Sequence, residues 1–227
     1  MKKILIILFS LGISMPMALS QTEALINPDM IFRFTFEGRT YDVVKLMKTW
    51  DDAAKIATAR GGKLVEINSR GEQNVVFNAI INDAGITQNY TSVIDGGGIA
   101  YVWIGATDKV TEGKWMWDGN NSGNGLNFWN GQGNAGKGDG KVINNYYVNW
   151  GGASKGVYNE PDDHNGQDMA AMGLTAWPLG SGTLGMPGEW NDLDGSNELY
   201  FVIEYTLAAP DAKEREQIKD YFNPDRH

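Results

Sequence analysis

The sequence contains no cysteine and only two histidines, His164 and His227, among 227 residues. The missing thiols exclude disulfide bonds, a cysteine nucleophile and a lipid-modified cysteine. With so few histidines, we expect neither a zinc or copper site nor a Ser-His-Asp or Cys-His catalytic set. Any metal chemistry must therefore come from oxygen-bearing side chains.

A long hydrophobic run occurs only at the start of the chain. Lys2 and Lys3 precede the apolar run Ile4–Met17, and Ala18–Ser20 supplies small residues for cleavage. The pattern predicts a secretory signal peptide over residues 1–20. A membrane anchor is the less favoured alternative, because the run is short and no basic stop follows it. A cysteine-free chain suits bacterial export, so we expect a secreted, periplasmic or cell-surface protein.

Positive charge is also scarce, with 19 Lys and Arg against 28 Asp and Glu. Loss of residues 1–20 removes two basic and no acidic residues, which brings the net charge to −11. This charge disfavours nucleic acid and anionic lipid surfaces as partners. It is compatible with cation binding, but also with an acidic surface that only keeps the protein soluble.

The first half of the chain predicts a hairpin followed by two helices. Alternating apolar residues over 30–47 indicate two strands that turn at Glu37-Gly38. Thr49 is a predicted helix N-cap, and Gly61-Gly62 ends that helix. The capping-box spacing from Ser69 to Glu72 predicts a second helix.

The second half predicts strands and long loops. Strands are indicated at 101–108, 114–119 and 199–205, with a further one at 170–177. The segment 120–149 is rich in Gly and Asn, so we expect a long loop or a small excursion. Helices early and strands late favour an α+β fold.

Acidic residues are concentrated in the sequence EPDDHNGQD, residues 160–168. Its four carboxylates belong to Glu160, Asp162, Asp163 and Asp168. Crowded carboxylates either raise their pKa values or share a cation, and Ca²⁺ prefers six to eight oxygen ligands. Gln167 adds an amide oxygen. A solvated acidic loop is the alternative interpretation.

Two other stretches carry oxygen ligands beside predicted strands. Asp108 and Glu112 follow the strand at 101–108, while Asn191 and Asp192 follow Trp190 shortly before the last strand. Neither stretch has the spacing of an EF-hand.

Together these segments resemble a C-type lectin-like domain, from about residue 31 to residue 205. The matching stretches, in order, are TWDDAAKIATARGGKLVEINSRGEQNVV, YVWIGATDKVTEGKWMWDG, NEPDDHNGQD, EWND and YFVIEY. The resemblance implies two helices packed on small antiparallel sheets, with a long loop region that carries calcium sites. The expected organisation is a linker at 21–30, the domain at 31–207 with an insertion at about 120–149, and a charged tail at 208–227.

The resemblance also implies two calcium sites. The sugar-binding site would use Glu160, Asp162, Gln167, Asn191 and Asp192. The second site would use Asp108, Glu112, Asp163 and Asp168, with Gln167 between the two ions. Sugar contacts would come from Glu160, Asp162, Asn191 and Asp192.

Two residues depart from the family pattern. Asp162 stands where the family has Asn, and Gln167 stands where it usually has Glu. Calcium binding is expected to survive, but Glu-Pro-Asp is neither the mannose-type Glu-Pro-Asn nor the galactose-type Gln-Pro-Asp, so the monosaccharide stays open. The resemblance further implies a cis peptide bond before Pro161.

The expected function is a secreted, calcium-dependent, carbohydrate-binding protein without catalytic activity. The alternative is a calcium-stabilised adhesive or structural protein that binds a protein or a surface. A glycosidase would need paired carboxylates free for chemistry, and these are expected to hold metal. Expected partners are a glycan or surface ligand, with no nucleic acid and no membrane insertion after signal cleavage. Trp150 and Trp190 are expected in the core; sugar stacking is left open for Phe128, Trp129, Tyr146, Tyr147 and Trp177.

Overall fold

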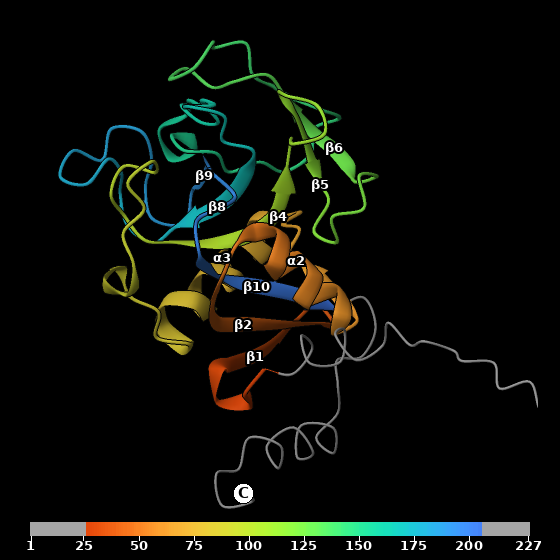
Figure 1. Ribbon diagram of the computed structural model, residues 1–227. Helices are drawn as coiled ribbons and strands as arrows, with labels where there is room; N and C mark the ends of the chain where they lie inside the picture. Colours follow the sequence, from red (N-terminus) through yellow and green to blue (C-terminus); the bar gives the residue numbers. More distant parts are fainter. Residues whose placement is uncertain (1–25, 206–227) are drawn as a thin grey trace, which may run out of the picture.

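The computed structural model describes residues 26–205 of the chain (Figure 1). The predicted signal peptide, the start of the predicted linker and the predicted tail at 208–227 lie outside the described residues. Within residues 26–205, none of the helices combines the length and the apolar character needed to cross a membrane. A 3₁₀ turn, η1 (Pro28–Met30), leads into the first strand.

The predicted hairpin is confirmed. Strand β1 (Ile31–Phe36) pairs antiparallel with β2 (Arg39–Lys48). Glu37 and Gly38 turn the chain with φ values of 47° and 78°. A two-residue turn with positive φ at both positions matches the right-handed twist of the strands, which explains the glycine here.

Both predicted helices begin at the expected caps. The Thr49 hydroxyl accepts a hydrogen bond from the Asp52 N–H at the start of α2 (Trp50–Ala59). The Ser69 hydroxyl does the same for the Glu72 N–H at the start of α3 (Arg70–Asn78), which continues into a π-helical turn, η2 (Ala79–Asp83). Gly61, at φ 78°, follows the end of α2. These caps satisfy N–H groups that the helices cannot bond internally.

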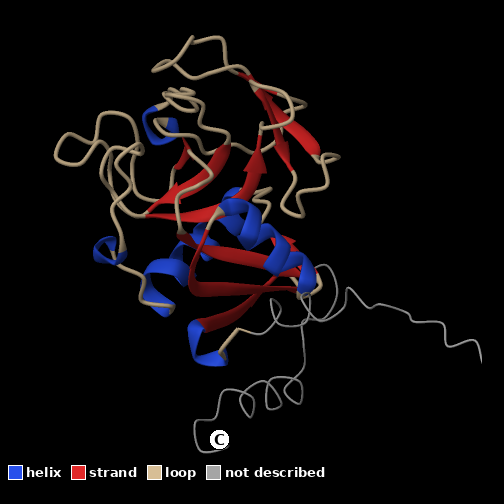
Figure 2. Ribbon diagram, viewed as in Figure 1, coloured by secondary structure: helices blue, strands red, loops and turns tan. Residues whose placement is uncertain are grey.

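The strands form one connected network rather than separate small sheets (Figure 2). Its main order is β1-β2-β10-β4-β5-β6-β7; β3 pairs with β10, and β8 pairs with β4 and β9. The remaining strands are β3 (Gly62–Leu64), β4 (Tyr101–Thr107), β5 (Lys114–Trp117), β6 (Leu126–Asn130), β7 (Lys141–Val142), β8 (Met169–Gly173), β9 (Trp190–Leu193) and β10 (Leu199–Tyr205). The pair β10–β4 is parallel and the others are antiparallel.

The two helices pack against opposite faces of the central strands. Val43 and Val202 belong to the core cluster that includes α3, whereas Val44 and Ile203 belong to the cluster that includes α2. This division follows from the period of two along a strand, because neighbouring side chains point to opposite faces. Burial of these apolar faces holds the helices to the sheet.

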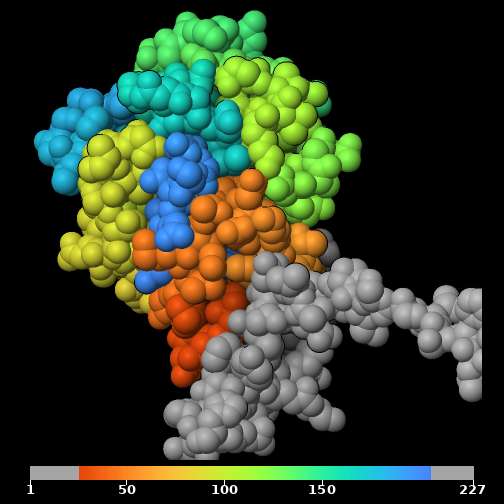
Figure 3. Space-filling view, in the orientation of Figure 1, coloured from red at the N-terminus to blue at the C-terminus, as the bar shows by residue number. Residues whose placement is uncertain are grey.

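The segment 120–149 is a folded excursion that extends the sheet. It contributes β6 and β7, which continue the sheet from β5, and it forms the top of the molecule in Figure 3. Phe128 and Trp129 are buried, so sugar stacking, left open from the sequence, is wrong for both. Trp150 and Trp190 are fully buried in the same core cluster, as predicted.

Candidate cation and ligand site

Three carboxylates gather at the junction of the acidic loop and β9. Ligand oxygens of Glu160, Asp162 and Asp192 lie within 4.8 Å of one another. Strand β8 follows the acidic loop directly and pairs with β9, with Ala170 opposite Asp192. This pairing brings the end of the loop to Asp192, 30 positions beyond Asp162 along the chain. We call these three residues the first cluster.

Asp192 ties the acidic loop to the sheet. Its carboxylate accepts hydrogen bonds from the backbone N–H of Asp162, at 3.1 Å, and of Asp163, at 2.7 Å. Burial raises the pKa of Asp192 to about 8, against the opposing effect of the Asp163 N–H, and the charge of Asp162 adds to the rise. The carboxylate therefore holds the loop, and no basic side chain within residues 26–205 forms a salt bridge with it.

Glu160 presents a buried oxygen to the same cluster. The peptide bond between Glu160 and Pro161 is cis, as predicted. Oε1 of Glu160 accepts a hydrogen bond from the indole Nε1 of Trp177 at 3.2 Å, while Oε2 has no hydrogen-bond partner among the described residues. Burial raises the pKa of Glu160 well above its ordinary value, and the charges of Asp192 and Asp162 raise it further. A charged oxygen in this position is costly unless it meets a proton or a cation.

The second cluster lies at the other end of the acidic loop. Carboxylate oxygens of Asp108, Glu112 and Asp168 also lie within 4.8 Å of one another. The antiparallel pairing of β4 with β8 puts Thr107 opposite Met169, so the residues just outside that pair, Asp108 and Asp168, meet. Sheet register thus explains why acids 60 positions apart share one site.

Asp108 is the most buried member of the second cluster. Its Oδ2 accepts a hydrogen bond from the Gly113 N–H at 2.9 Å, but Oδ1 is buried without a partner in the described part of the chain. Burial raises the pKa of Asp108 to about 8, and the charges of Glu112 and Asp168 add to this. The pKa values of Glu112 and Asp168 are raised as well, first by burial and then by the charge of Asp163.

Asp163 connects the two clusters. Its N–H donates to Asp192 of the first cluster, and its charge acts on Glu112 and Asp168 of the second. Oδ2 of Asp163 accepts a 3.3 Å hydrogen bond from Gln132 Nε2, whereas Oδ1 is buried and has no partner among residues 26–205. Asp163 thus lies between the two clusters, and its role as a ligand of the second calcium ion stays a prediction.

The two amides predicted as ligands differ in what they offer. Asn191 donates its Nδ2 to the Tyr101 hydroxyl at 3.1 Å, which leaves Oδ1 as its atom for the first cluster. Gln167 accepts from the His164 N–H at 3.1 Å and donates Nε2 to the carbonyl of Asp95 at 3.0 Å. The Gln167 oxygen thus accepts one hydrogen bond from the protein, and its expected place between two ions stays a prediction.

The donor atoms of both clusters fit a hard divalent cation. Buried carboxylate oxygens without a hydrogen-bond partner, within the described range, belong to Asp108, Glu160 and Asp163. The charge of Lys109 opposes the rise in the pKa of Asp168, and the charge of Lys137 opposes the rise in the pKa of Glu112. Neither lysine forms a salt bridge with that acid in the described residues. Carboxylate and amide oxygens without sulfur or imidazole are the ligand set of calcium.

A hollow of about 190 Å³ opens beside the first cluster. Glu160, Asp162 and Asn191 line one part of it, and Trp177 and Leu184 line another. We call it the site hollow. Trp177 is only 1% exposed, and its indole N–H donates a hydrogen bond to Glu160. Its main role at the site hollow is therefore to position the Glu160 carboxylate.

Asp95 also lines the site hollow, and the sequence did not point to it. It lies in a turn closed by the bridge between Val93 and Ile99, and its side chain accepts hydrogen bonds from the Asp194 N–H and from Asn197. The only local signal is the run of three glycines after it, which marks a turn but no ligand.

A family model for the lectin C-type domain matches residues 47–202, which is well over half of the chain. The protein belongs to the C-type lectin domain family. Its two helices, mixed sheet and long loop region are those of the C-type lectin fold. Domains of this family are generally non-catalytic and typically bind calcium.

Curated relatives of this C-type lectin domain come from animals. One chain of the snaclec coagulation factor IX-binding protein of Protobothrops flavoviridis is 34% identical over 87 residues, which is 36% of this chain and 59% of the relative. The hemolymph lipopolysaccharide-binding protein of Periplaneta americana is 34% identical over 79 residues, 34% of this chain and 27% of the relative. The chain thus spans less than two thirds of these relatives. They lend no support to the expected bacterial source.

Solved structures with a similar arrangement include three C-type lectin folds. The mouse scavenger receptor C-type lectin carbohydrate-recognition domain is 21% identical, with a TM-score of 0.47 over 78% of this chain and 97% of that one. The carbohydrate-recognition domain of cow CD23 is 20% identical, with a TM-score of 0.48 over 78% and 95%. The herring type II antifreeze protein is 19% identical, with a TM-score of 0.47 over 78% and 97%.

Proposed function

We propose that this protein is a secreted, calcium-dependent, carbohydrate-binding lectin without catalytic activity. The observation that carries the proposal is the buried Oε2 of Glu160, which has no hydrogen-bond partner in the described part of the chain and lies with Asp162 and Asp192 at the wall of an open hollow. Three carboxylates at such distances repel one another unless a cation lies between them. An open position on that cation would then face the hollow, where a ligand can reach it.

We assign one calcium ion to each cluster. The first would be held by Glu160, Asp162, Asp192 and the amide oxygen of Asn191. The second would be held by Asp108, Glu112, Asp163 and Asp168. Because the N–H groups of Asp162 and Asp163 both bond Asp192, filling either site also fixes the loop that serves the other.

The chemistry of the first cluster favours ligands that donate hydrogen bonds. Glu160 and Asp162 are both acceptors, and the Asn191 amide nitrogen is committed to Tyr101. Bound calcium supplies coordination positions for two neighbouring sugar hydroxyls. The carboxylates would then accept the hydroxyl protons, so a vicinal diol is the smallest ligand that satisfies the site.

Secretion is proposed from the signal-like residues 1–20, which places the protein outside the cell, in a periplasm or at a cell surface. The cysteine-free chain is the observation in favour of bacterial export.

The deciding experiment is a glycan array with the full mature chain in calcium and in EGTA. Calcium-dependent binding of a subset of neutral glycans is expected, with loss in Glu160→Gln, which keeps the side-chain size but removes one charge. Asp29→Asn is the matched control, since it removes an exposed carboxylate far along the chain from both clusters. Binding that persists in EGTA, or in Glu160→Gln, would refute the proposal.

A second function is favoured by the relatives, because one of them is named for binding coagulation factor IX. Under this alternative, the protein is a calcium-stabilised adhesive or structural lectin-like protein whose ligand is a protein or a surface. Calcium-induced stabilisation without any bound glycan on the array would favour it over the lectin.

A further inference from the structure

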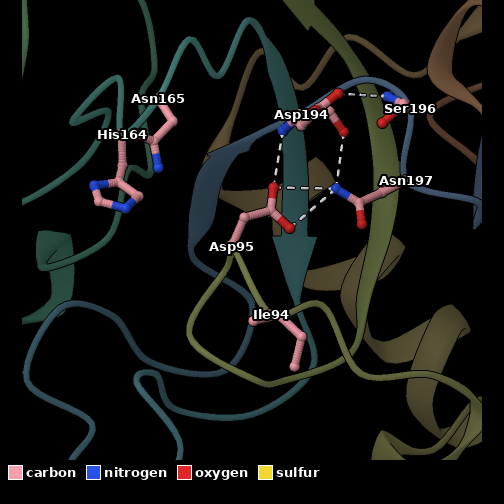
Figure 4. Close-up of a pocket in the computed structure, with 7 residues that line it drawn as sticks. All are labelled: Ile94, Asp95, His164, Asn165, Asp194, Ser196 and Asn197. Carbon is pink, nitrogen blue, oxygen red and sulfur yellow. Dashed lines mark hydrogen bonds between the residues drawn. The ribbon is translucent and has the colours of Figure 1, made fainter.

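A second hollow, larger than the site hollow, lies next to it. It measures about 530 Å³ and is lined by Ile94, Asp95, His164, Asn165, Asp194, Ser196 and Asn197. Figure 4 shows His164 and Asn165 across an open space from Asp194, Ser196 and Asn197, with Asp95 between the two groups. We call this the adjoining hollow. It contains no residue of the first or the second cluster.

The two hollows share a boundary. Asp95 and His164 line both of them. A ligand seated against Glu160 and Asp162 therefore meets Asp95 and His164 at its edge and, if it is longer than one sugar unit, extends past them. The two hollows therefore adjoin at Asp95 and His164.

The wall between the hollows is held in place before any ligand arrives. The Asp95 carboxylate accepts hydrogen bonds from the Asp194 N–H at 3.1 Å and from the Asn197 amide at 3.1 and 3.2 Å. The Asp194 carboxylate in turn accepts from the Ser196 N–H at 2.8 Å (Figure 4). Preorganised polar groups lose little conformational entropy on binding, which favours recognition.

The lining of the adjoining hollow selects by charge. Its two carboxylates, Asp95 and Asp194, have no Lys or Arg beside them among the lining residues, and the site hollow adds Glu160 and Asp162. An acidic sugar would be repelled from both hollows. Hydroxyl donors suit these acceptors, and Ile94, which is 83% exposed, offers an apolar contact for the C–H face of a sugar ring.

We propose that the two hollows form one groove for a neutral oligosaccharide of at least two units, with one unit at the first cluster and the next against Ile94, Asp194 and Ser196. This inference rests on the proposed lectin function and gives it a ligand length and a charge preference. Asp194 and Ile94 are then specificity-determining residues that do not touch the calcium-bound unit.

The test compares the methyl glycoside of the neutral sugar best bound on the array with a neutral disaccharide that carries the same terminal unit. Calorimetry in calcium is expected to give a dissociation constant at least tenfold lower for the disaccharide. Ile94→Ala and Asp194→Ala should remove that gain while leaving the affinity for the methyl glycoside unchanged. Both side chains are exposed, so neither change leaves a cavity in the core, and Asp194→Asn keeps an acceptor for the Ser196 N–H as a check on the local turn.

Matched controls are Leu179→Ala, an exposed apolar residue, and Glu198→Ala, an exposed acid, neither of which lines either hollow. Both should keep the disaccharide gain. Asp194→Lys should admit a disaccharide with a carboxylate on its second unit, with affinity at least tenfold above that of the unmodified chain.

The outcomes separate the two proposals. Equal affinity for methyl glycoside and disaccharide, or an undiminished gain in Ile94→Ala and Asp194→Ala, overturns the groove and leaves the lectin function standing. Absence of calcium-dependent binding for both sugars overturns the lectin function and the groove with it.

Discussion

The side chain of Gln167 donates its amide hydrogen to the carbonyl of Asp95 at 3.0 Å, and the same nitrogen lies 3.5 Å from the Asp95 carboxylate. The two residues are 72 positions apart, and their contact joins the acidic loop to the turn that follows Val93. A glutamate at position 167 would set a second carboxylate against Asp95. The neutral amide of Gln167 therefore suits its contact with Asp95.

Gln167→Glu is expected to destabilise the calcium-free protein by about 1–2 kcal/mol, because it loses a hydrogen bond and adds like charge. Calcium should stabilise the variant more than it stabilises the unmodified protein, because the new carboxylate lies near both clusters. Thermal unfolding in EGTA and in calcium measures both effects. Asn165→Asp adds the same charge to the exposed part of the loop and should behave like the unmodified chain. Equal unfolding midpoints in EGTA would contradict the prediction.

Asp108→Asn should remove one of two calcium ions. The asparagine oxygen can still accept the Gly113 N–H, but the buried charge of the second cluster is lost. Calorimetric titration is expected to show a stoichiometry that falls from two to one, with affinity for sugar reduced less than in Glu160→Gln. Two ions bound by the variant would show that Asp108 is not a ligand.

Calcium removal should loosen the acidic loop and lower the free energy of unfolding. A ligand that binds only the folded state, present at 100 times its dissociation constant, contributes about 2.7 kcal/mol for one site. The unfolding midpoint should therefore rise with calcium concentration in the unmodified protein, and rise less in Asp108→Asn. A midpoint that is independent of calcium would contradict the assignment of both clusters.

Gly133→Ala should weaken calcium binding from a distance. Gly133 donates its N–H to the Pro161 carbonyl, and a Cβ here would lie 2.4 Å from the Asn159 backbone and 2.6 Å from the Glu160 carbonyl oxygen. The insertion would have to move off the acidic loop, at a cost of about 1–3 kcal/mol. Gly156→Ala, where a Cβ meets open space, is the control: it adds backbone strain without this clash. Calcium affinity that is equal in the two variants would show that the contact does not support the site.

The buried carboxyl group of Glu204, away from both clusters, should make the free energy of unfolding depend on pH. Burial raises its pKa from an ordinary value near 4.5 to about 7, against the opposing charge of Lys63. The folded protein thus binds this proton more tightly than the unfolded chain, so stability falls as pH rises from about 4.5 to about 7, by a total on the order of 3 kcal/mol. Glu204→Gln should lack this contribution. Urea unfolding of both proteins from pH 4 to pH 8 should show a stability difference that grows with pH and then levels; a constant difference would refute it.

Local features of the fold were predictable because they depend on neighbouring residues. The caps at Thr49 and Ser69 and the turn at Glu37-Gly38 each involve groups within a few positions, and all three formed as expected. The ligand residues were predictable for a different reason. The acids of 160–168 and the pair Asn191-Asp192 stand out by type and order, and the resemblance supplied their partners at Asp108 and Glu112.

Contacts between distant segments could not be read from the residues alone. Phe128 and Trp129 looked free to meet a sugar until the β5–β6–β7 pairing buried them. Gln167 was predicted from its place in the acidic loop, but its hydrogen bond to the Asp95 carbonyl, 72 positions away, could not be predicted.

The sequence by itself determined that any metal here must be held by oxygen, because cysteine is absent and histidine is scarce. It also showed where the acidic residues are concentrated along the chain. Only the tertiary structure decided how those acids divide. The β4–β8 register joins Asp108 to Asp168, and the β8–β9 register brings Asp192 to the loop that holds Glu160. Side-chain chemistry is a property of each residue, whereas strand register depends on packing across the whole domain, and register is what divides the acids into two clusters.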